Sequence, residues 1–229
     1  MPLAVTLRAA VALTGRFPAL AGVDLDVDSG EVVVLEGPNG AGKTSVLRAC
    51  AGLLPLTGGE ITVLGHDLRR GCGAVRRSVG LLGHAPALYD DLNVVENVRF
   101  AVRAAGGETS QVDGALERLG LTGRLRRTAA GKLSAGQRRR VALAAVVARA
   151  PRLWLLDEPH AALDADARHL LEGLVAEAAA DGATVLMASH EPGETVRLSD
   201  RVVTMAGGRV AAVRRGERRR VMRGGAHVA

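Results

Sequence analysis

The chain has few aromatic residues, few cysteines and no long apolar run. Aromatic residues are 2% of its 229 residues, too few for the stacking platforms that bind single-stranded nucleic acid, so we expect no nucleic-acid partner. Cys50 and Cys72 follow no metal-ligand spacing and the N-terminus resembles no secretory signal, which favours a reducing cytoplasm. The longest apolar runs, such as residues 141–148, end at arginines and fall short of the ~18 residues that suggest a membrane span. Any membrane role therefore requires a partner.

Lysine is also nearly absent, because Lys43 and Lys132 are the only two among 30 basic residues. Each of them is therefore worth examining. The 24 acidic residues leave a net charge of +6, for which a solvated arginine surface is a simpler explanation than a specific anion-binding face. The basic run at residues 213–225 could contact anionic lipid, but a frayed, solvated tail is the simpler interpretation.

Hydrophobic residues are 48% of the chain, and their pattern predicts one α/β unit with an inserted lobe. Residues 22–37 alternate and then become continuously apolar, which indicates an antiparallel strand followed by a buried central one. A further turn and strand over residues 57–68 should join the antiparallel layer. The interval from about 93 to 149 is helical, and Asn93 with Glu96 is typical of a helix start. Three later segments predict two buried strands and a hairpin: residues 152–158, 183–190 and 200–213.

The string GPNGAGKT, residues 37–44, matches the phosphate-binding pattern G-x-x-x-x-G-K-[ST] between an apolar strand and a helical segment. Such a loop, called the P-loop below, turns backbone N–H groups and a helix N-terminus toward a phosphate. Lys43 can reach the β- and γ-phosphates of a nucleotide, and Thr44 can place its hydroxyl on Mg²⁺. The predicted nucleotide-binding residues are Gly37, Pro38, Asn39, Gly40, Ala41, Gly42, Lys43, Thr44 and Ser45.

Two acids end the predicted strand at residues 152–158. Ligands of parallel sheets bind at the carboxyl ends of the strands, so Asp157 is expected beside the phosphates, where it can hold Mg²⁺ directly or through water. Glu158 is then free to orient the attacking water and accept its proton.

The string KLSAGQRRRVALA, residues 132–144, places a hydroxyl and bare backbone donors at a helix start. With the P-loop and the acid pair, it resembles the ATP-binding cassette (ABC) ATPases, whose signature is usually written LSGGQ. The resemblance implies ATP and Mg²⁺ as ligands, and a head-to-tail homodimer in which the signature residues contact ATP on the other subunit: Ser134, Ala135, Gly136 and Gln137. It also implies that Asp164 lies in a loop facing the partner and that His190 contacts the γ-phosphate and helps to hold the catalytic water.

Two positions depart from this family. The aromatic residue that usually stacks on adenine corresponds to Thr14, and whether Phe17 replaces it is open. A glutamine that usually reaches Mg²⁺ is replaced by His84. Since imidazole prefers softer metals, we expect His84 to act on Mg²⁺ only through a water.

Three strings narrow the resemblance to the haem exporter ATPases of bacterial cytochrome c maturation: Glu36 before the P-loop, the pair Gly83-His84, and LSAGQ. The implied fold is a P-loop NTPase (RecA-like) core with an antiparallel β-subdomain at residues 1–84 and 150–213, a helical subdomain at 85–149 and a basic tail at 214–229. The implied function is ATP hydrolysis that powers export through a separate membrane permease, at the cytoplasmic face of the membrane. The alternatives are the ATPase of another exporter, of drugs or lipids, or a membrane-regulatory ATPase.

Overall fold

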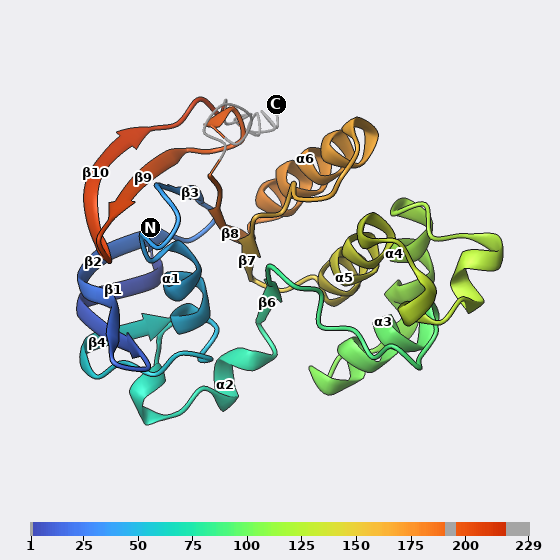
Figure 1. Cartoon of the computed structure of the whole chain (residues 1–229), viewed down its shortest axis with the longest axis horizontal. Coiled ribbons are helices and arrows are strands. Elements are labelled where there is room, and N and C mark those ends of the chain that lie inside the picture. Colours follow the sequence, from blue (N-terminus) through green and yellow to red (C-terminus); the bar gives the residue numbers. More distant parts are fainter. Residues whose placement is uncertain (1, 191–195, 219–229) are drawn as a thin grey trace, which may run out of the picture.

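Two β-sheets and a group of helices make up the computed structural model, which describes residues 2–190 and 196–218 (Figure 1). The first sheet is antiparallel with strand order β2-β1-β4-β5. Its strands are β1 (Leu3–Thr14), β2 (Phe17–Asp28), β4 (Gly58–Val63) and β5 (His66–Asp67). The predicted antiparallel layer is therefore confirmed.

The second sheet has the order β10-β9-β3-β8-β7-β6, and every neighbouring pair in it is parallel except β9 with β10. Its strands are β3 (Val32–Glu36), β6 (Val79–Leu82), β7 (Leu153–Asp157), β8 (Thr184–Ala188), β9 (Arg201–Ala206) and β10 (Arg209–Arg215). The predicted buried strands and the C-terminal hairpin are present.

Residues 3–14 form a strand that the sequence pattern did not predict. The pairing of β1 with β2 shifts register between Leu7 and Ala10, where Ala9 has a φ of 44°. A β-bulge of this kind exchanges the sheet faces to which the odd- and even-numbered side chains point. The alternation of apolar and polar residues is therefore broken in the middle of the strand.

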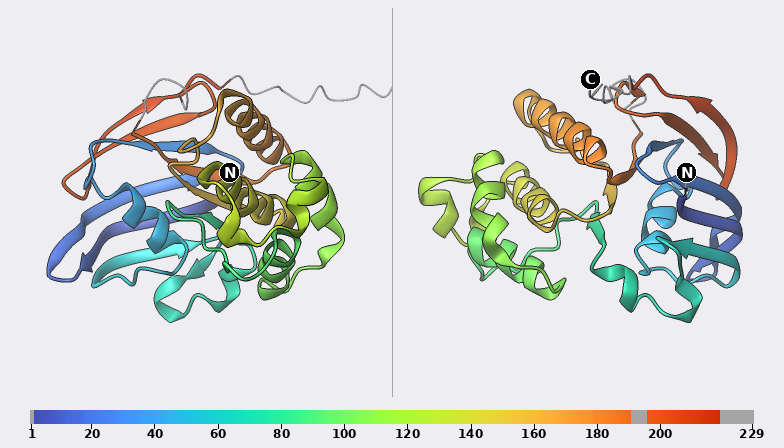
Figure 2. Two further views of the ribbon diagram at one scale, coloured as in Figure 1. Left: turned by 45° about the vertical axis from the view of Figure 1, so that its right-hand side comes forward. Right: turned by 180° about the vertical axis from the view of Figure 1, so that it is seen from behind.

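The helices are α1 (Lys43–Cys50), α2 (Gly73–Arg76), α3 (Val94–Ala104), α4 (Val112–Arg118), α5 (Ala135–Arg149) and α6 (Ala165–Ala180). Short 3₁₀ turns lie at Leu68–Arg70, Thr109–Gln111, Gly123–Arg127 and Ala130–Lys132. Asn93 and Glu96 form the expected capping box at the start of α3. In both views of Figure 2, α3, α4 and α5 lie together at the end of the molecule away from β1 and β2. No helix in the described ranges is both long enough and apolar enough to cross a bilayer.

The six-stranded sheet separates two apolar cores, because successive side chains of a strand point to opposite faces. On one face, Val32 and Val34 of β3 pack in a cluster with α3, α4, α5 and α6. On the other face, Val33 and Leu35 pack with α1 and the antiparallel sheet. Each central strand is therefore buried on both sides, as its unbroken apolar sequence predicts.

The last strand, β10, extends two residues past residue 213, where the core was expected to end. Arg214 and Arg215 belong to β10, and Arg214 forms an ion pair with Glu36. Arg218 donates a hydrogen bond to Asp200. Arg214 and Arg218 therefore have carboxylate partners in the folded core, although the Arg214 side chain is 48% exposed. Residues 219–229 lie outside the described part of the chain.

Candidate functional site

The P-loop joins the end of β3 to the start of α1. Gly37 has a φ of 139°, and a Cβ at that position would lie 2.2 Å from the carbonyl oxygen of Met205. At Gly42, with a φ of 104°, a Cβ would lie 2.8 Å from the carbonyl oxygen of Ala19. Both positions combine a left-handed backbone with a close backbone neighbour, so only glycine fits at them.

Strands from far along the chain hold this loop in place. Gly208, at the turn between β9 and β10, donates its N–H to the Ala41 carbonyl at 3.0 Å and accepts from the Ala21 N–H at 2.8 Å. Glu36, just before the loop, accepts from the Thr204 hydroxyl at 2.8 Å and from Arg214 at 2.9 Å. The P-loop is therefore fixed by the first sheet and by the last hairpin.

Lys43 is 6% exposed and lies across the inside of the loop. Its Nζ donates to the Gly37 carbonyl at 2.7 Å and to the Pro38 carbonyl at 3.1 Å. Gly42, the N-cap of α1, offers no side chain to the first N–H groups of the helix. The ammonium and these helix donors together create a local positive field suited to phosphate.

A hollow of about 430 Å³ opens on the P-loop. Four separate parts of the chain reach it besides the loop itself: β2, the segment after β6, the end of β7 and the end of β8. Its lining residues are Ala19, Asn39, Gly40, Ala41, Gly42, Lys43, Thr44, Ser45, His84, Glu158 and His190. The structure thus brings His84 and His190, which the family resemblance placed at the nucleotide site, to the phosphate loop.

Asp157 and Thr44 place two oxygens beside this hollow. The Thr44 hydroxyl donates to Asp157 Oδ1 at 3.0 Å. Burial raises the pKa of Asp157, and the Thr44 hydrogen bond opposes that rise. Two adjacent hard oxygen donors fit Mg²⁺, which completes its shell with waters and substrate phosphates. Across the described residues, no three His, Cys, Asp or Glu side chains gather into a metal site of protein ligands alone.

Glu158 and His190 form a pair at the mouth of the hollow. Glu158 Oε2 lies 2.7 Å from His190 Nδ1, and the Glu158 side chain is the less exposed of the two. Neighbouring strands carry them, since β7 ends just before Glu158 and β8 ends just before Ser189 and His190. Residues 191–195, which follow His190, lie outside the described residues.

The signature residues do not line the hollow. Ser134 caps α5 by accepting the Gln137 N–H at 3.2 Å, and the Gln137 side chain accepts the Ser134 N–H at 3.0 Å. Ser134 and Ala135 are exposed, as is Asp164, which caps α6 through the Ala167 N–H at 2.9 Å. Both helix starts are therefore exposed and lie outside the hollow of the same chain.

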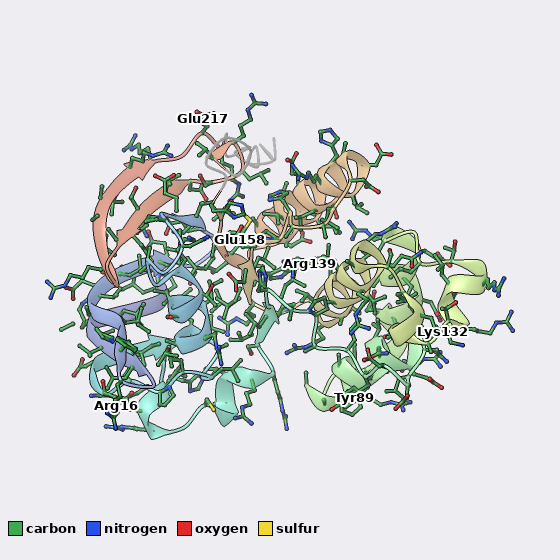
Figure 3. The ribbon with its side chains drawn as sticks, in the orientation of Figure 1. Arg16, Tyr89, Lys132, Arg139, Glu158 and Glu217 are labelled. Atoms are coloured by element: carbon green, nitrogen blue, oxygen red, sulfur yellow. The ribbon has the colours of Figure 1, made fainter. Side chains whose placement is uncertain are left out.

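Arg139 is a site residue that the sequence analysis missed. Arg139, labelled in Figure 3, is buried on α5, and it hydrogen-bonds carbonyls just after β6 and at the end of β7. A signal was present, because Arg139 is four and seven residues before Leu143 and Val146, which are both buried on the same helix. That spacing places an arginine on the apolar face of α5.

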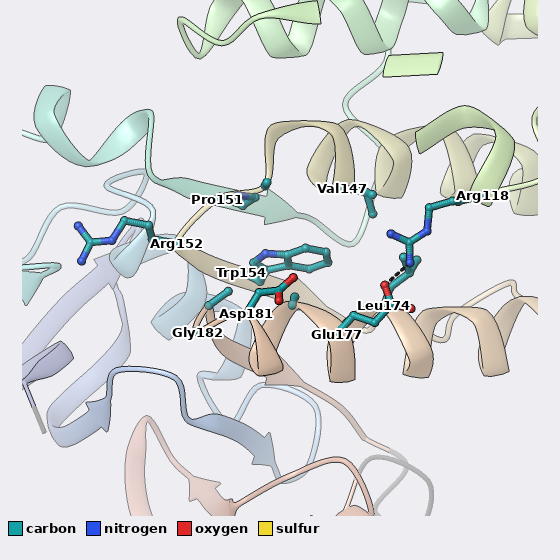
Figure 4. A pocket seen from close by; sticks show the side chains of 12 residues that line it. Arg118, Val147, Pro151, Arg152, Trp154, Leu174, Glu177, Asp181 and Gly182 are labelled. Carbon is teal, nitrogen blue, oxygen red and sulfur yellow. Dashed lines mark hydrogen bonds and ion pairs between the residues drawn. The ribbon is translucent and has the colours of Figure 1, made fainter. Parts of the chain in front are cut away.

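Another pocket, of about 350 Å³, lies at the opposite end of β7 (Figure 4). Trp154 and Leu174 form its apolar wall, and Arg118 forms an ion pair with Glu177 at its rim. It lies near the amino end of β7, whereas ligands of parallel sheets bind at the carboxyl ends. The chemistry therefore belongs to the P-loop hollow.

Comparison with known proteins agrees with this geometry. The family model described as "ABC transporter" matches residues 20–161. An Fe(3+) ions import ATP-binding protein, FbpC of Streptomyces avermitilis, is 41% identical over 90% of this chain, which spans 61% of that protein. A cytochrome c biogenesis ATP-binding export protein, CcmA of Dechloromonas aromatica, is also 41% identical, over 80% of this chain and 92% of its own length.

Two solved structures share the fold. An ATP-binding subunit of an ABC transporter superposes with a TM-score of 0.85 at 28% identity, over 92% of this chain and 89% of the other. A dimeric ATP-binding cassette in a post-hydrolysis state with ADP and Pi superposes with a TM-score of 0.86 at 26% identity, over 94% and 99%. The expected ligands, ATP with Mg²⁺, are those of this family. The chain belongs to the ABC transporter family, and its fold is that of the ATP-binding cassette.

Proposed function

We propose that this chain hydrolyses ATP with Mg²⁺ and thereby powers transport through a separate membrane permease. The observation that carries the proposal is that Lys43, Glu158 and His190 line one hollow and that Asp157 accepts a hydrogen bond from Thr44, which also lines it. A phosphate-binding cation, a metal-binding oxygen pair and a carboxylate oriented by an imidazole are the parts that phosphoryl transfer to water requires.

Each residue has a defined task. Lys43 and the N–H groups at the start of α1 bind the β- and γ-phosphates. Glu158 orients a water and accepts its proton, while His190, 2.7 Å away, fixes the direction of that carboxylate. Mg²⁺ held by Thr44 and Asp157 would neutralise charge that develops on the phosphate oxygens.

The exposed signature residues support a head-to-tail homodimer. The α5 N-terminus with Ser134 is exposed and does not line the hollow of its own P-loop, so it offers donors for a phosphate bound elsewhere. In the dimer we propose, that phosphate belongs to ATP on the second copy, and the loop with Asp164 lies at the interface.

An apolar groove of about 590 Å³ supports the permease partner. It lies between the segment that carries Gly83 and the helices α3 and α5. Tyr89 and Phe100 are exposed beside it and meet edge to face, with ring centroids 4.8 Å apart. Exposed aromatic pairs are typical anchors for a partner chain. We assign the groove to a cytoplasmic segment of the permease, which would hold this chain at the cytoplasmic face of the membrane.

We further propose that the transporter powered by this chain is the haem exporter of cytochrome c maturation. The support is the combination of Glu36, Gly83-His84 and the LSAGQ signature, together with the similarity to CcmA proteins. A second candidate is the ATPase of an ion importer, which the equal identity to FbpC favours.

Replacement of Glu158 by glutamine tests the hydrolytic site. We expect Glu158→Gln to lower phosphate release by about 10²- to 10⁴-fold, because the general base is lost, while ATP still produces a stable dimer. The matched control is Glu172→Gln, a carboxylate on α6 that lies 3.6 Å from the exposed His169. Hydrolysis at the wild-type rate in Glu158→Gln would refute the assignment.

The cargo is tested by purifying the chain with its native membrane partner. A haem exporter predicts that haem changes ATP turnover of this complex, whereas Fe³⁺ with its binding protein does not. The opposite response would favour the importer.

A further inference from the structure

Arg139 occupies a position on α5 where an apolar residue is expected. It is 3% exposed, and burial lowers the pKa of its guanidinium. Within the part of the chain that the structure describes, its Nε has no hydrogen-bond acceptor. Burying an arginine under these conditions is costly, so the contacts of its other two nitrogens must offset the cost.

Those contacts all involve backbone carbonyls, from two different loops. Nη1 donates to Gly83 and, at 3.1 Å, to His84. Nη2 donates to Asp157 and Glu158, at 2.6 Å each. The planar guanidinium therefore joins the loop after β6 to the loop after β7. A lysine could not make both pairs, since its single nitrogen lacks the forked geometry.

One of these carbonyls belongs to a strained residue. Glu158 has a φ of 47°, in the left-handed region that non-glycine residues avoid. Its N–H donates to the Ala188 carbonyl at 3.0 Å, and its own carbonyl accepts from Arg139. Such strain persists only where the surroundings hold it from both sides. Arg139 therefore helps to hold the Glu158 backbone, together with the Ala188 carbonyl and with the Ala161 N–H, which donates to the Glu158 carbonyl at 3.1 Å.

The same helix contacts the partner-facing loop. A Cβ at Gly136 would lie 2.9 Å from the Ala162 carbonyl, so the start of α5 touches the segment that leads to Asp164. At the other end of α5, Arg149 donates to the carbonyls of Arg76, at the end of α2, and Val79, at the start of β6. Arginines at both ends thus fix α5 to β6, and a displacement of its signature end would be transmitted to the catalytic loop.

We propose that Arg139 is a positioning residue that couples the signature end of α5 to the Glu158 carboxylate and to the His84 loop of the same chain. The proposal rests on the function proposed above. In the proposed dimer, the signature residues of one copy contact ATP bound to the second copy. Binding of that ATP then becomes a condition for the correct position of Glu158 in the first copy's own nucleotide site.

The test compares ATP hydrolysis by Arg139→Lys and Arg139→Gln with wild type, using the full-length chain without permease. Because Lys43 and the P-loop are untouched, we expect the KM for ATP to change by less than about threefold, while kcat falls by roughly 10- to 100-fold, as small misplacements of catalytic groups do. The matched control is Arg138→Lys, whose parent side chain contacts Asp90 and the Ala130 carbonyl instead. That control should retain wild-type kcat.

A second measurement separates positioning from general destabilisation. In single turnover, adding Arg139→Lys to Glu158→Gln should lower the residual rate by less than about threefold, because no carboxylate base remains to be positioned. The proposal would be overturned if Arg139→Lys lowered the residual rate of Glu158→Gln by the same factor as it lowers the wild-type rate. Failure of both Arg139 variants to fold would also overturn it. If Arg139→Lys has the wild-type kcat while the separate Glu158→Gln variant is inactive, this inference alone is rejected. If Glu158→Gln hydrolyses ATP at the wild-type rate, the proposed function is rejected.

Discussion

Replacing Phe17 by alanine should weaken the binding of ATP without weakening the fold. Phe17 forms a direct cross-strand pair with Thr14, the position where the family usually has an aromatic residue, so the two side chains share a face of the sheet. Ala19, two residues further along the chain at a register shift of this hairpin, lines the P-loop hollow. The Phe17 ring is 79% exposed, which leaves it free to stack on adenine. This arrangement favours Phe17 in the place of the missing aromatic residue.

The magnitude follows from stacking and from exposure. An aromatic ring stacked on a base contributes about 1–3 kcal/mol, so the Kd for ATP should rise by about 5- to 150-fold in Phe17→Ala. Because the ring is mostly exposed, its removal should change the free energy of unfolding by no more than about 0.5 kcal/mol, or roughly 2 °C in Tm.

Calorimetric titration in the Glu158→Gln background measures ATP binding without turnover. Tripolyphosphate, which lacks adenine, should bind Phe17→Ala as it binds the parent. Leu13→Ala is the control, because Leu13 is a partly exposed apolar residue of the same hairpin that pairs with Pro18 on the other face. An unchanged Kd for ATP in Phe17→Ala, or an equal loss for tripolyphosphate, would show that this ring does not stack on the base.

Four further outcomes are expected. Asp157→Asn should raise the Tm of the metal- and nucleotide-free protein at pH 7, because burial raises the pKa of Asp157 and the folded state therefore loses stability as pH rises through that raised value. Asparagine carries no charge and removes this penalty. A lower Tm in the variant, or a gain in Tm that persists below about pH 4, would contradict the prediction. Burial raises the pKa of Cys50 to about 12, so a thiol reagent at pH 8 should label only the partly exposed Cys72 in the native chain and both thiols after denaturation, as counted by mass spectrometry. Gly42→Ala should abolish the rise in Tm on adding ATP, since its Cβ would lie 2.8 Å from a backbone oxygen at a φ of 104°; a normal ATP shift would argue against this view of the loop. His84→Gln should leave the Kd for ATP unchanged and alter hydrolysis stimulated by the permease, and equal stimulation would make His84 an ordinary loop residue.

Local signals were readable from the sequence because neighbouring residues determine them. The capping pairs at Asn93 and Ser134 and the buried strands all depend on short-range spacing. The meeting of Glu158 with His190 was expected only through the family resemblance, since it depends on β7 and β8 being neighbours in the sheet. The exact pairing of their side chains could not be derived from spacing.

Other features depend on contacts that no local pattern encodes. The bulge at Ala9 interrupts the alternation in β1, and so that strand was missed. The role of Arg139 depends on two loops meeting at its guanidinium, although its place on the apolar face of α5 was a readable anomaly. The early residues of the C-terminal basic run were misjudged because their carboxylate partners, Glu36 and Asp200, come from distant segments.

The bracing of the P-loop by the last hairpin has a consequence for synthesis on the ribosome. The loop emerges early, but the hydroxyl of Thr204 that binds Glu36 follows 168 residues later, and Gly208 comes later still. Before that hairpin has left the exit tunnel, the nascent chain lacks the supports that shape its phosphate cradle. Cellular ATP should therefore protect the finished chain from proteolysis but not a ribosome-bound fragment that stops before residue 200.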